Sequence, residues 1–284
     1  MAVKRVGIVG SGIMGTGIAE TAAATGHEVV LRSRSQSTAD AMAAGLEKAL
    51  NKQVEQGKRT EADRDDILAR VTATSDFHAL GACDLVIESV IEDLEVKREL
   101  FHELDRVCRP GAVLATNTST LPVVELAMQT SRPEAVCGIH FFNPAPVMSL
   151  VEVVRPLTAS DATITAAREL AEACGKTAVE VKDRAGFVVN ALLFPYLNNA
   201  VRLLESGVAT MEGIDEAMKG GCGFPMGPFA LLDLVGLDTS VAILEALYEE
   251  NRNPGDAPQP LLRRMVAAEL LGRKSGQGFY DYRK

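Results

Sequence analysis

A histidine and a glutamate twelve residues apart could form an acid/base pair. His140 follows the apolar run 136–139, and Glu152 follows the apolar run 148–151. A carboxylate bound to one imidazole nitrogen fixes the tautomer of the ring and stabilises the imidazolium, as a general acid/base histidine requires. The same spacing fits a buried structural hydrogen bond equally well, so both interpretations stay open. The remaining histidines lie in turns or on a charged helix and are expected on the surface: His27, His78 and His102.

A glycine-rich turn near the start of the chain could bind the pyrophosphate of a dinucleotide. Residues 10–15 read G-S-G-I-M-G, directly after a β-branched run and before an Ala-rich stretch. There, Gly10 permits a tight turn, Gly12 lets backbone N–H groups approach a phosphate, and Gly15 allows a helix to pack closely on a strand. A glycine turn without a ligand would look similar. In this context the pattern predicts a dinucleotide site whose contacts are Gly10, Gly12, Ile13, Met14 and Gly15.

The residues that end the second strand indicate which dinucleotide binds. An Asp or Glu at this point would accept a hydrogen bond from the ribose 2′-OH of NAD, whereas an Arg accommodates the 2′-phosphate of NADP. The sequence has Arg32, Ser33 and Arg34 and no carboxylate. Guanidinium groups bind a phosphate that an Asp would repel. We therefore expect NADP(H) to be favoured through Ser33 and Arg34, with NAD(H) possible if the arginines are only solvated charges.

Hydroxyl and amide side chains cluster at residues 117–120, which read N-T-S-T after the apolar run 113–115. Ligands of open α/β sheets bind at the carboxyl ends of the strands, so these groups could orient a substrate alcohol. They could also cap a helix that begins near Leu121, and taken alone the capping interpretation is the stronger one.

These residues must be positioned by alternating strands and helices. The expected strands cover 3–10, 28–31, 84–87, 113–115 and 136–139, and the expected helices cover 13–25, 92–107 and 123–130. This alternation is typical of a parallel, doubly wound sheet of the Rossmann type in the α/β class. Residues 37–70 are too long for one crossover helix and predict an inserted helical hairpin. The hairpin carries a basic cluster: Lys48, Lys52, Lys58 and Arg59.

The chain changes character after Val181. Residues 187–204 are apolar on almost all sides, and the remainder has helical periodicity without strands until a short FYDY tail. We expect a dinucleotide-binding domain over 1–184 and an all-helical domain over 185–284, with the boundary in the polar segment 182–186. A helix that is apolar all round must be buried on several sides, and a small domain achieves this more readily against a second subunit, so we expect a homodimer.

The composition excludes several classes of protein. Of the 284 residues, 47% are hydrophobic and 24% charged, which excludes a disordered, collagen-like or coiled-coil chain. The net charge of −9 argues against binding to nucleic acid. No signal-peptide core is present and no apolar run reaches the ~20 residues of a membrane span, so we expect a cytoplasmic protein. Five dispersed cysteines indicate reduced, packed thiols, with neither disulfides nor a metal site.

Five motifs, in order along almost the whole chain, resemble the 3-hydroxyacyl-CoA dehydrogenase family and especially its bacterial 3-hydroxybutyryl-CoA members. They are the glycine turn at 10–19, NTS at 117–119, HFFNP at 140–144, GFVVN at 186–190 and GRKSGQGFY at 272–280. The resemblance implies an oxidoreductase that passes the C3 hydride of an L-3-hydroxyacyl-CoA to a nicotinamide cofactor, with acetoacetyl-CoA as the product.

The resemblance also implies roles for individual residues. His140 would take the proton of the C3 hydroxyl, with Glu152 as its carboxylate partner. Ser119 is similar to the serine that hydrogen-bonds the 3-hydroxyl, and Asn190 to the asparagine that helps hold the reacting substrate.

Further positions match residues that, in the family, contact the cofactor or its surroundings: Glu92, Lys97, Asn143 and Lys274. The hairpin is similar to the one that helps bind CoA. Its Lys52, together with Lys58 and Arg59, could meet the CoA phosphates.

The chain departs from the family pattern at two positions. Ser33 stands where an acidic residue is usual, and Phe224 begins a segment that usually reads His-Pro-Met-Gly-Pro. Two other functions stay open. One is a dehydrogenase of a non-CoA hydroxy acid or sugar acid, against which the basic hairpin argues. The other is a nucleotide-binding protein without turnover, against which the joint presence of four residues argues: Ser119, His140, Glu152 and Asn190.

Overall fold

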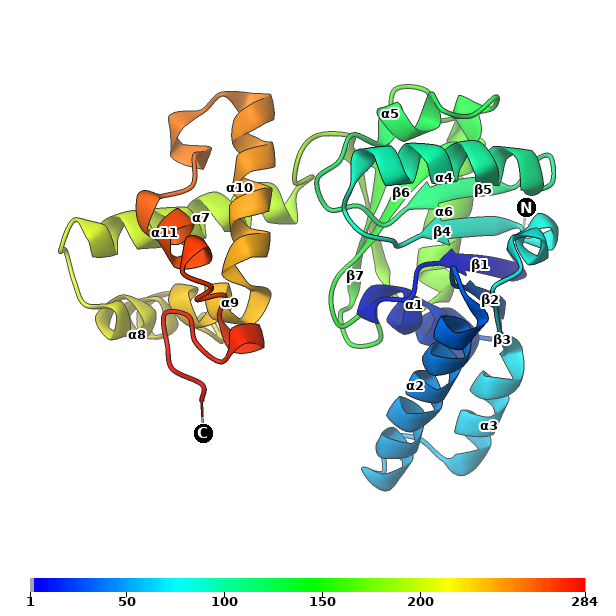
Figure 1. Cartoon of the computed structure of the whole chain (residues 1–284), viewed down its shortest axis with the longest axis horizontal. Helices are drawn as coiled ribbons and strands as arrows, with labels where there is room; N and C mark the ends of the chain where they lie inside the picture. Colours follow the sequence, from blue (N-terminus) through cyan, green and yellow to red (C-terminus); the bar gives the residue numbers. More distant parts are fainter. Residues whose placement is uncertain (1–2, 284) are drawn as a thin grey trace. The chain divides into compact units, whose positions relative to one another are not determined.

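The computed structural model describes residues 3–283 and divides into two compact units, one ending at Asp183 and the other beginning at Arg184 (Figure 1). The first unit is a mixed α/β structure and the second is helical. The predicted fold class is therefore confirmed.

An eight-stranded sheet lies at the centre of the first unit, in the order β3-β2-β1-β4-β5-β6-β7-β8. Its strands are β1 (Arg5–Val9), β2 (Glu28–Arg32), β3 (Val71–Thr74), β4 (Leu85–Glu88), β5 (Val113–Thr116), β6 (Val136–Phe141), β7 (Leu150–Arg155) and β8 (Thr177–Lys182). The strands from β3 to β6 are parallel as expected, but β7 is antiparallel to β6, so a wholly parallel sheet is a wrong prediction. A parallel pair needs a crossover of a dozen or more residues, whereas only residues 142–149 join these two strands. The chain therefore turns directly back.

Sequence patterns did not predict β3, β8 or helix α6 (Asp161–Ala173). The strand β3 reads VTAT and β8 reads TAVEVK, so apolar side chains alternate with polar ones over short runs. Such edge strands carry a weaker signal than the continuous apolar runs of the central strands.

Helices cover both faces of the sheet. One face packs against α1 (Ile13–Ala24) and α6, and the other against α4 (Leu94–Val107) and α5 (Val123–Ala127). Ile139 and Val151 lie in the core with α1 and α6. Because side chains alternate along a strand, the residues next to them, His140 and Glu152, point to the face covered by α4 and α5.

The predicted hairpin is formed by α2 (Gln36–Glu55) and α3 (Glu61–Arg70). A buried carboxylate on α1 ties it to the rest of the unit. Glu20, 5% exposed, accepts a hydrogen bond from Nε2 of Gln53 at 2.9 Å and lies 3.5 Å from Nη2 of Arg59. The guanidinium of Arg59 therefore binds side chains of the protein itself.

The second unit consists of α7 (Val189–Glu205), α8 (Met211–Cys222), α9 (Pro228–Val235), α10 (Leu237–Asn251) and α11 (Pro260–Ala267). Short 3-10 helices in the chain are η1 (Phe77–Ala82), η2 (Pro133–Ala135), η3 (Pro254–Asp256) and η4 (Arg273–Ser275). The helix α7 buries Phe194 and Leu197 in the core of this unit, whereas its Leu192 is 72% exposed. Within the chain, α7 is thus buried on one side rather than on several. The tail forms isolated bridges and is held by the buried Asp233, which accepts from the N–H groups of Phe279 and Tyr280 at 2.8 Å each.

Two expectations about surface and interior are wrong. His27 is buried, with Nδ1 3.2 Å from the carbonyl oxygen of Ala22. Cys222, the last residue of α8, is exposed rather than packed. The other four cysteines are buried, and burial raises the pKa of the Cys83 and Cys137 thiols to about 12 and that of Cys108 to about 11.

Across residues 3–283, no helix has the length and apolar character to cross a bilayer.

Candidate active site

Four buried polar side chains lie on one face of the sheet near the carboxyl ends of the parallel strands. Glu88 ends β4, Thr116 ends β5, His140 is the next-to-last residue of β6, and Glu152 lies in β7. Their strand neighbours point into the core with α1 and α6. Alternation along each strand therefore brings all four to the face under α4 and α5.

His140 and Glu152 are register partners in the antiparallel pair of β6 and β7. Nδ1 of His140 lies 2.8 Å from Oε2 of Glu152, and the two side chains are 5% and 1% exposed. An ionised carboxylate can only accept, so Nδ1 carries the hydrogen of this contact and Nε2 is the basic nitrogen of the neutral ring. Glu152 lies inside β7 rather than at the end of a strand, and the pairing of β7 with β6 brings it to His140.

The hydroxyl of Ser119 lies on the other side of the imidazole. Its Oγ is 3.1 Å from Nε2 of His140, so the hydroxyl donates to the nitrogen that Glu152 does not bind. The capping interpretation of residues 117–120 holds for Thr118 rather than for Ser119, because Oγ1 of Thr118 accepts from the N–H of Leu121 at 2.9 Å, just before α5. The N-terminus of α5 itself is capped by Asp183, which accepts from the N–H groups of Val123 at 3.0 Å and Val124 at 2.8 Å.

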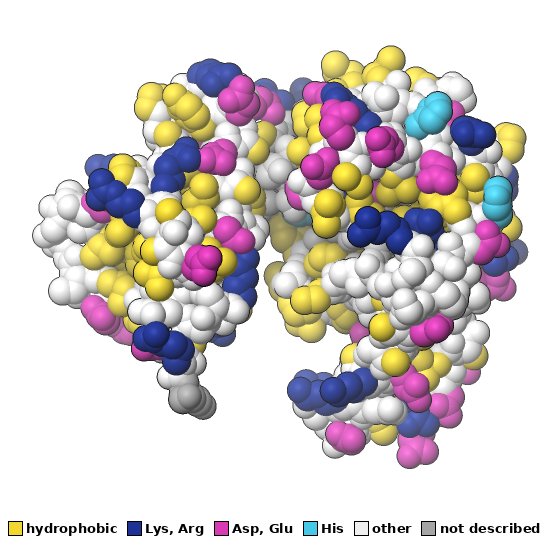
Figure 2. All heavy atoms as spheres, in the orientation of Figure 1, with side chains coloured by type: hydrophobic (Ala, Val, Ile, Leu, Met, Phe, Trp, Pro, Cys, Tyr) yellow, Lys and Arg dark blue, Asp and Glu magenta, His cyan; other side chains and the backbone are white. Residues whose placement is uncertain are grey.

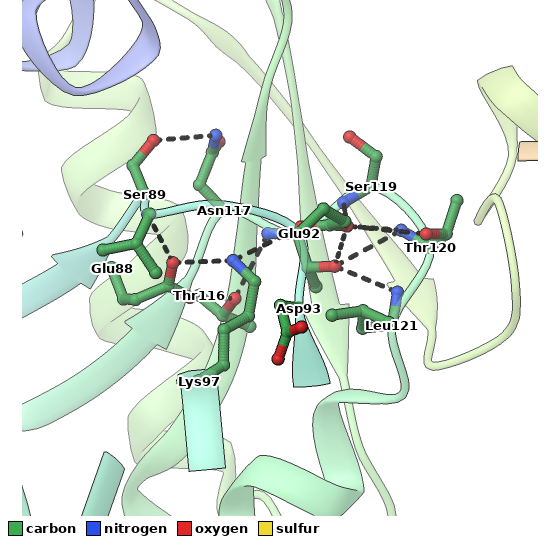
Figure 3. Close-up of polar contacts among 12 residues, drawn as sticks. Glu88, Ser89, Glu92, Asp93, Lys97, Thr116, Asn117, Ser119, Thr120 and Leu121 are labelled. Atoms are coloured by element: carbon green, nitrogen blue, oxygen red, sulfur yellow. Dashed lines mark hydrogen bonds and ion pairs between the residues drawn. The ribbon is translucent and has the colours of Figure 1, made fainter. Parts of the chain in front are cut away.

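Glu92 holds the loop that carries Ser119 (Figure 3). Its Oε1 accepts from the N–H of Ser119 at 2.8 Å, from the N–H of Thr120 at 3.3 Å and from the hydroxyl of Thr118. Burial alone would raise the pKa of Glu92, but the Lys97 ammonium and these hydrogen bonds outweigh burial and hold the pKa below its ordinary value. Glu92 is therefore an ionised acceptor at neutral pH.

Lys97 lies behind Glu92 and is enclosed by two carboxylates. Its Nζ is 3.3 Å from Oε2 of Glu92 and donates to Oε1 of Glu88 at 2.6 Å. Glu88 also accepts from the N–H of Val90 at 2.6 Å and from Oγ1 of Thr116 at 2.8 Å.

The glycine turn has the space and the charge that a pyrophosphate needs. Gly10 has φ +141°, and a Cβ on it would lie 2.2 Å from the carbonyl oxygen of Ser89. A Cβ on Gly15 would lie 2.3 Å from the carbonyl oxygen of Gly10, so only glycine lets α1 approach the turn so closely. At Gly12 a Cβ would meet nothing within 4 Å. No described side chain caps α1, and its first turn, which begins with the exposed Ile13, carries no acidic residue. The N-terminal N–H groups of α1 therefore fit an anionic ligand.

Arg32 ends β2, and Ser33 and Arg34 follow it; the three residues have different surroundings. Arg34 is exposed, whereas Ser33 is 4% exposed and its N–H donates to the carbonyl of Thr74 at 3.0 Å. The guanidinium of Arg32 lies 4.7 Å from the ring centroid of Phe77, and burial lowers its pKa. Arg34 is therefore the more exposed of the two arginines.

Asn143 is exposed on the loop that follows β6, and its peptide bond to Pro144 is cis. A buried lysine anchors this loop. Nζ of Lys176 donates to the carbonyl oxygens of Ala145 and Met148 at 2.8 Å each, and burial lowers the pKa of Lys176.

The remaining candidate residues lie in other parts of the chain. Met14 is half-buried in the first turn of α1. Lys52 is exposed on α2, and Figure 2 shows basic side chains on the α2 side of the hairpin with acidic ones toward α3. In the second unit, Asn190 is buried on α7, and Nζ of Lys274 lies 2.6 Å from Oδ2 of Asp238.

Sequence reasoning missed four residues at or beside the site: Glu88, Thr116, Lys176 and Asp183. A signal existed for Glu88 and Thr116, because each is a polar residue that ends an apolar strand, as His140 nearly does. Lys176 and Asp183 carry no such signal, since their partners are brought to them only by the folded chain. Among residues 3–283, no group of three or more His, Cys, Asp or Glu is placed to hold a metal ion.

Comparison with known proteins gives matches over almost the whole chain. Residues 5–184 match the NAD-binding domain of 3-hydroxyacyl-CoA dehydrogenase, and residues 186–282 match its C-terminal domain. A Mycobacterium tuberculosis protein named 3-hydroxybutyryl-CoA dehydrogenase is 48% identical over 283 residues, which cover 99% of each chain. A Clostridioides difficile protein of the same name is 45% identical over 280 residues, which cover 99% of this chain and 100% of the relative. The crystal structure of (S)-3-hydroxybutyryl-CoA dehydrogenase from Ralstonia eutropha is 42% identical, covers 100% of both chains and has a TM-score of 0.96.

Proposed function

The chain belongs to the 3-hydroxyacyl-CoA dehydrogenase family, and on this premise we propose that it interconverts L-3-hydroxybutyryl-CoA and acetoacetyl-CoA. One observation carries the proposal. The hydroxyl of Ser119, the imidazole of His140 and the carboxylate of Glu152 lie in contact in one row, at the sheet edge where ligands of such folds bind.

The row can move a proton at the C3 oxygen of the substrate. In the oxidation direction Nε2 of His140 takes the hydroxyl proton, while Ser119 donates a hydrogen bond to the same oxygen as it becomes a carbonyl. Glu152 accepts a hydrogen bond from Nδ1–H and so stabilises the imidazolium that forms. A nicotinamide cofactor bound at the glycine turn would supply the hydride acceptor for C3. In reduction the imidazolium returns the proton.

The family match supports a nicotinamide cofactor, and we propose that NADP(H) is preferred to NAD(H). Support comes from the exposed guanidinium of Arg34 directly before α2, whose first turn carries no acidic residue. A phosphate at this position would gain charge-assisted hydrogen bonds and meet no carboxylate in that turn.

The hairpin supports a CoA ester over a free acid. Lys48, Lys52 and Lys58 are exposed in a chain of net charge −9, and they could bind the phosphates of CoA. Binding energy from this remote part of the substrate can be used at the reacting carbon.

We further propose a homodimer in a reducing compartment such as the cytoplasm. The exposed apolar side chains of Val188 and Leu192, 45% and 72% exposed, support a subunit contact through α7. The five free cysteines support the compartment. Light scattering of the purified protein tests the dimer, and a monomer at micromolar concentration would contradict it.

Initial rates with NADPH and NADH test the function. The substrates are acetoacetyl-CoA, longer 3-ketoacyl-CoAs and free acetoacetate. We expect kcat/KM for acetoacetyl-CoA far above that for acetoacetate, and a preference for NADPH of roughly tenfold, the scale of one or two charge-assisted hydrogen bonds. Equal efficiency with acetoacetate would contradict the CoA assignment, whereas faster turnover with NADH would contradict only the cofactor preference.

A further inference from the structure

Glu88 and Lys97 form a buried ion pair next to the candidate active site. Their side chains are 0% and 1% exposed, and Nζ of Lys97 lies 2.6 Å from Oε1 of Glu88. Removing two charges from water can cost more free energy than their attraction regains, so a buried ion pair is weak evidence for a stabilising role. Its place in the fold indicates another purpose.

Glu88 is a fixed anchor. Its Oε1 also accepts from the N–H of Val90 at 2.6 Å, and its Oε2 accepts from Oγ1 of Thr116, its register partner in β5, at 2.8 Å. Every one of these donors belongs to the sheet edge or to the turn that follows it.

Lys97 connects this anchor to the Ser119 loop through Glu92. In Figure 3 the Lys97 side chain rises from α4 between the two carboxylates. Its ammonium lies 3.3 Å from Oε2 of Glu92, and Oε1 of Glu92 accepts from the N–H of Ser119 at 2.8 Å. We call this chain of contacts the Glu88–Lys97–Glu92 bridge.

We propose that Glu88 and Lys97 are positioning residues of the reaction. Through Glu92 they fix the peptide of Ser119, and so they fix its Oγ at 3.1 Å from Nε2 of His140. This inference rests on the proposed function of the Ser119–His140–Glu152 row. Without the ammonium, the Glu88 and Glu92 carboxylates would repel each other and the Ser119 loop would lose its acceptor. A displacement of about 1 Å at a reacting group can lower turnover by about 10²-fold.

A double-mutant cycle with acetoacetyl-CoA separates this role from direct contact with the cofactor. Lys97→Met should lower kcat by about 10- to 100-fold in the wild-type background. In the Ser119→Ala background the same substitution should have little further effect, because the hydroxyl that it positions is already absent. The matched control is Arg98→Met, the next residue on α4, whose ion pairs go to Glu95 and Glu125. Its kcat should stay near that of the wild type.

Glu88→Gln is the conservative second variant and keeps the test valid if Lys97→Met does not fold. It should lower kcat in the wild-type background, where Ser119 is present, and should not lower it further in the Ser119→Ala background. The proposal would be overturned if Lys97→Met lowered kcat by the same factor in both backgrounds. It would also be overturned if the cofactor Kd rose by as much as kcat fell, and Lys97 would then be assigned to the cofactor.

A readout without substrate distinguishes failure of this proposal from failure of the proposed function. The ring ¹⁵N resonances of His140 should move in the same direction in Ser119→Ala and in Lys97→Met or Glu88→Gln, since all of them remove the hydroxyl from Nε2. If the His140 signals move in Ser119→Ala alone, the bridge does not position Ser119. If the wild-type protein does not turn over acetoacetyl-CoA, the proposed function fails and this measurement still tests the bridge.

Discussion

His140 and Glu152 face each other across the antiparallel junction of β6 and β7, as register partners whose Nδ1 and Oε2 atoms are 2.8 Å apart. A shift of one residue in this register would turn one of the two side chains to the opposite face of the sheet. The geometry of the pair is therefore set by strand pairing, which holds a functional group more rigidly than a loop does.

The first prediction concerns this pair. His140→Gln should lower kcat by about 10²–10⁴-fold, the range for loss of general acid/base catalysis, with little change in cofactor affinity. Glu152→Gln should also be severely impaired, because it keeps the size of the side chain and removes the charge that stabilises the imidazolium. Steady-state kinetics and calorimetric titration of the cofactor measure the two effects. Glu172→Gln on the exposed face of α6 is the control, and near-normal turnover of His140→Gln would show that another group handles the proton.

The second prediction concerns the cofactor. Arg34→Ile should lower kcat/KM with NADPH by about tenfold and leave NADH almost unchanged, since one charge-assisted contact to a phosphate contributes about 1.5 kcal/mol. Adding Ser33→Asp should shift the preference further toward NADH, because the new carboxylate can accept from the ribose 2′-OH. Arg32→Met is the control, as its guanidinium lies over Phe77. An unchanged ratio in Arg34→Ile would show that the arginine is only a solvated charge.

The third prediction separates two basic residues of the hairpin. Lys52→Met should raise KM for acetoacetyl-CoA by about fivefold, the scale of ~1 kcal/mol for one exposed charge contact, and should not affect free acetoacetate. Arg59→Met should instead lower the free energy of unfolding by about 1–3 kcal/mol, because it removes a charged partner of the buried Glu20. Urea denaturation measures the second effect. Lys4→Met, at an exposed position before β1, is the control, and identical behaviour of Lys52→Met and Arg59→Met would contradict the structural distinction.

The fourth prediction concerns stability and pH. Burial alone would raise the pKa of Asp84, but the N–H groups of Arg5 and Lys4 and the guanidinium of Arg109 hold it below its ordinary value of 3.8. The unfolded chain therefore binds this proton more tightly than the folded one, so the stabilisation is complete above about pH 5 and is lost as the pH falls from about 4 through the lowered pKa. Asp84→Asn should cost about 1.5–3 kcal/mol at pH 7 and progressively less at acid pH. Urea denaturation at several pH values measures this, with the exposed Asp66→Asn as control. A cost that does not change with pH would contradict the account.

Features that depend on residues close together in the chain could be predicted from the sequence, whereas features that depend on residues far apart in the chain could not. Strands such as β4 and β5 are continuous apolar runs, and the glycine turn needs only residues close together in the chain, so both could be predicted. The direction of β7 depends on how the short segment 142–149 returns the chain. The spacing of His140 and Glu152 allowed a pair, but only the register of β6 and β7 brings the two together. Asp183 caps α5 from sixty residues away, and no local pattern encodes such a contact.

The distribution of the cysteines gives the wild-type chain a natural attachment point for a spectroscopic probe. The thiolate is the reactive form of cysteine. Four of the cysteines are buried, and burial also raises the pKa of their thiols: Cys83, Cys108, Cys137 and Cys174. Cys222 alone among the five is exposed, at the end of α8. A maleimide dye or spin label at neutral pH should therefore attach once per chain, to the helical unit, without any engineered cysteine.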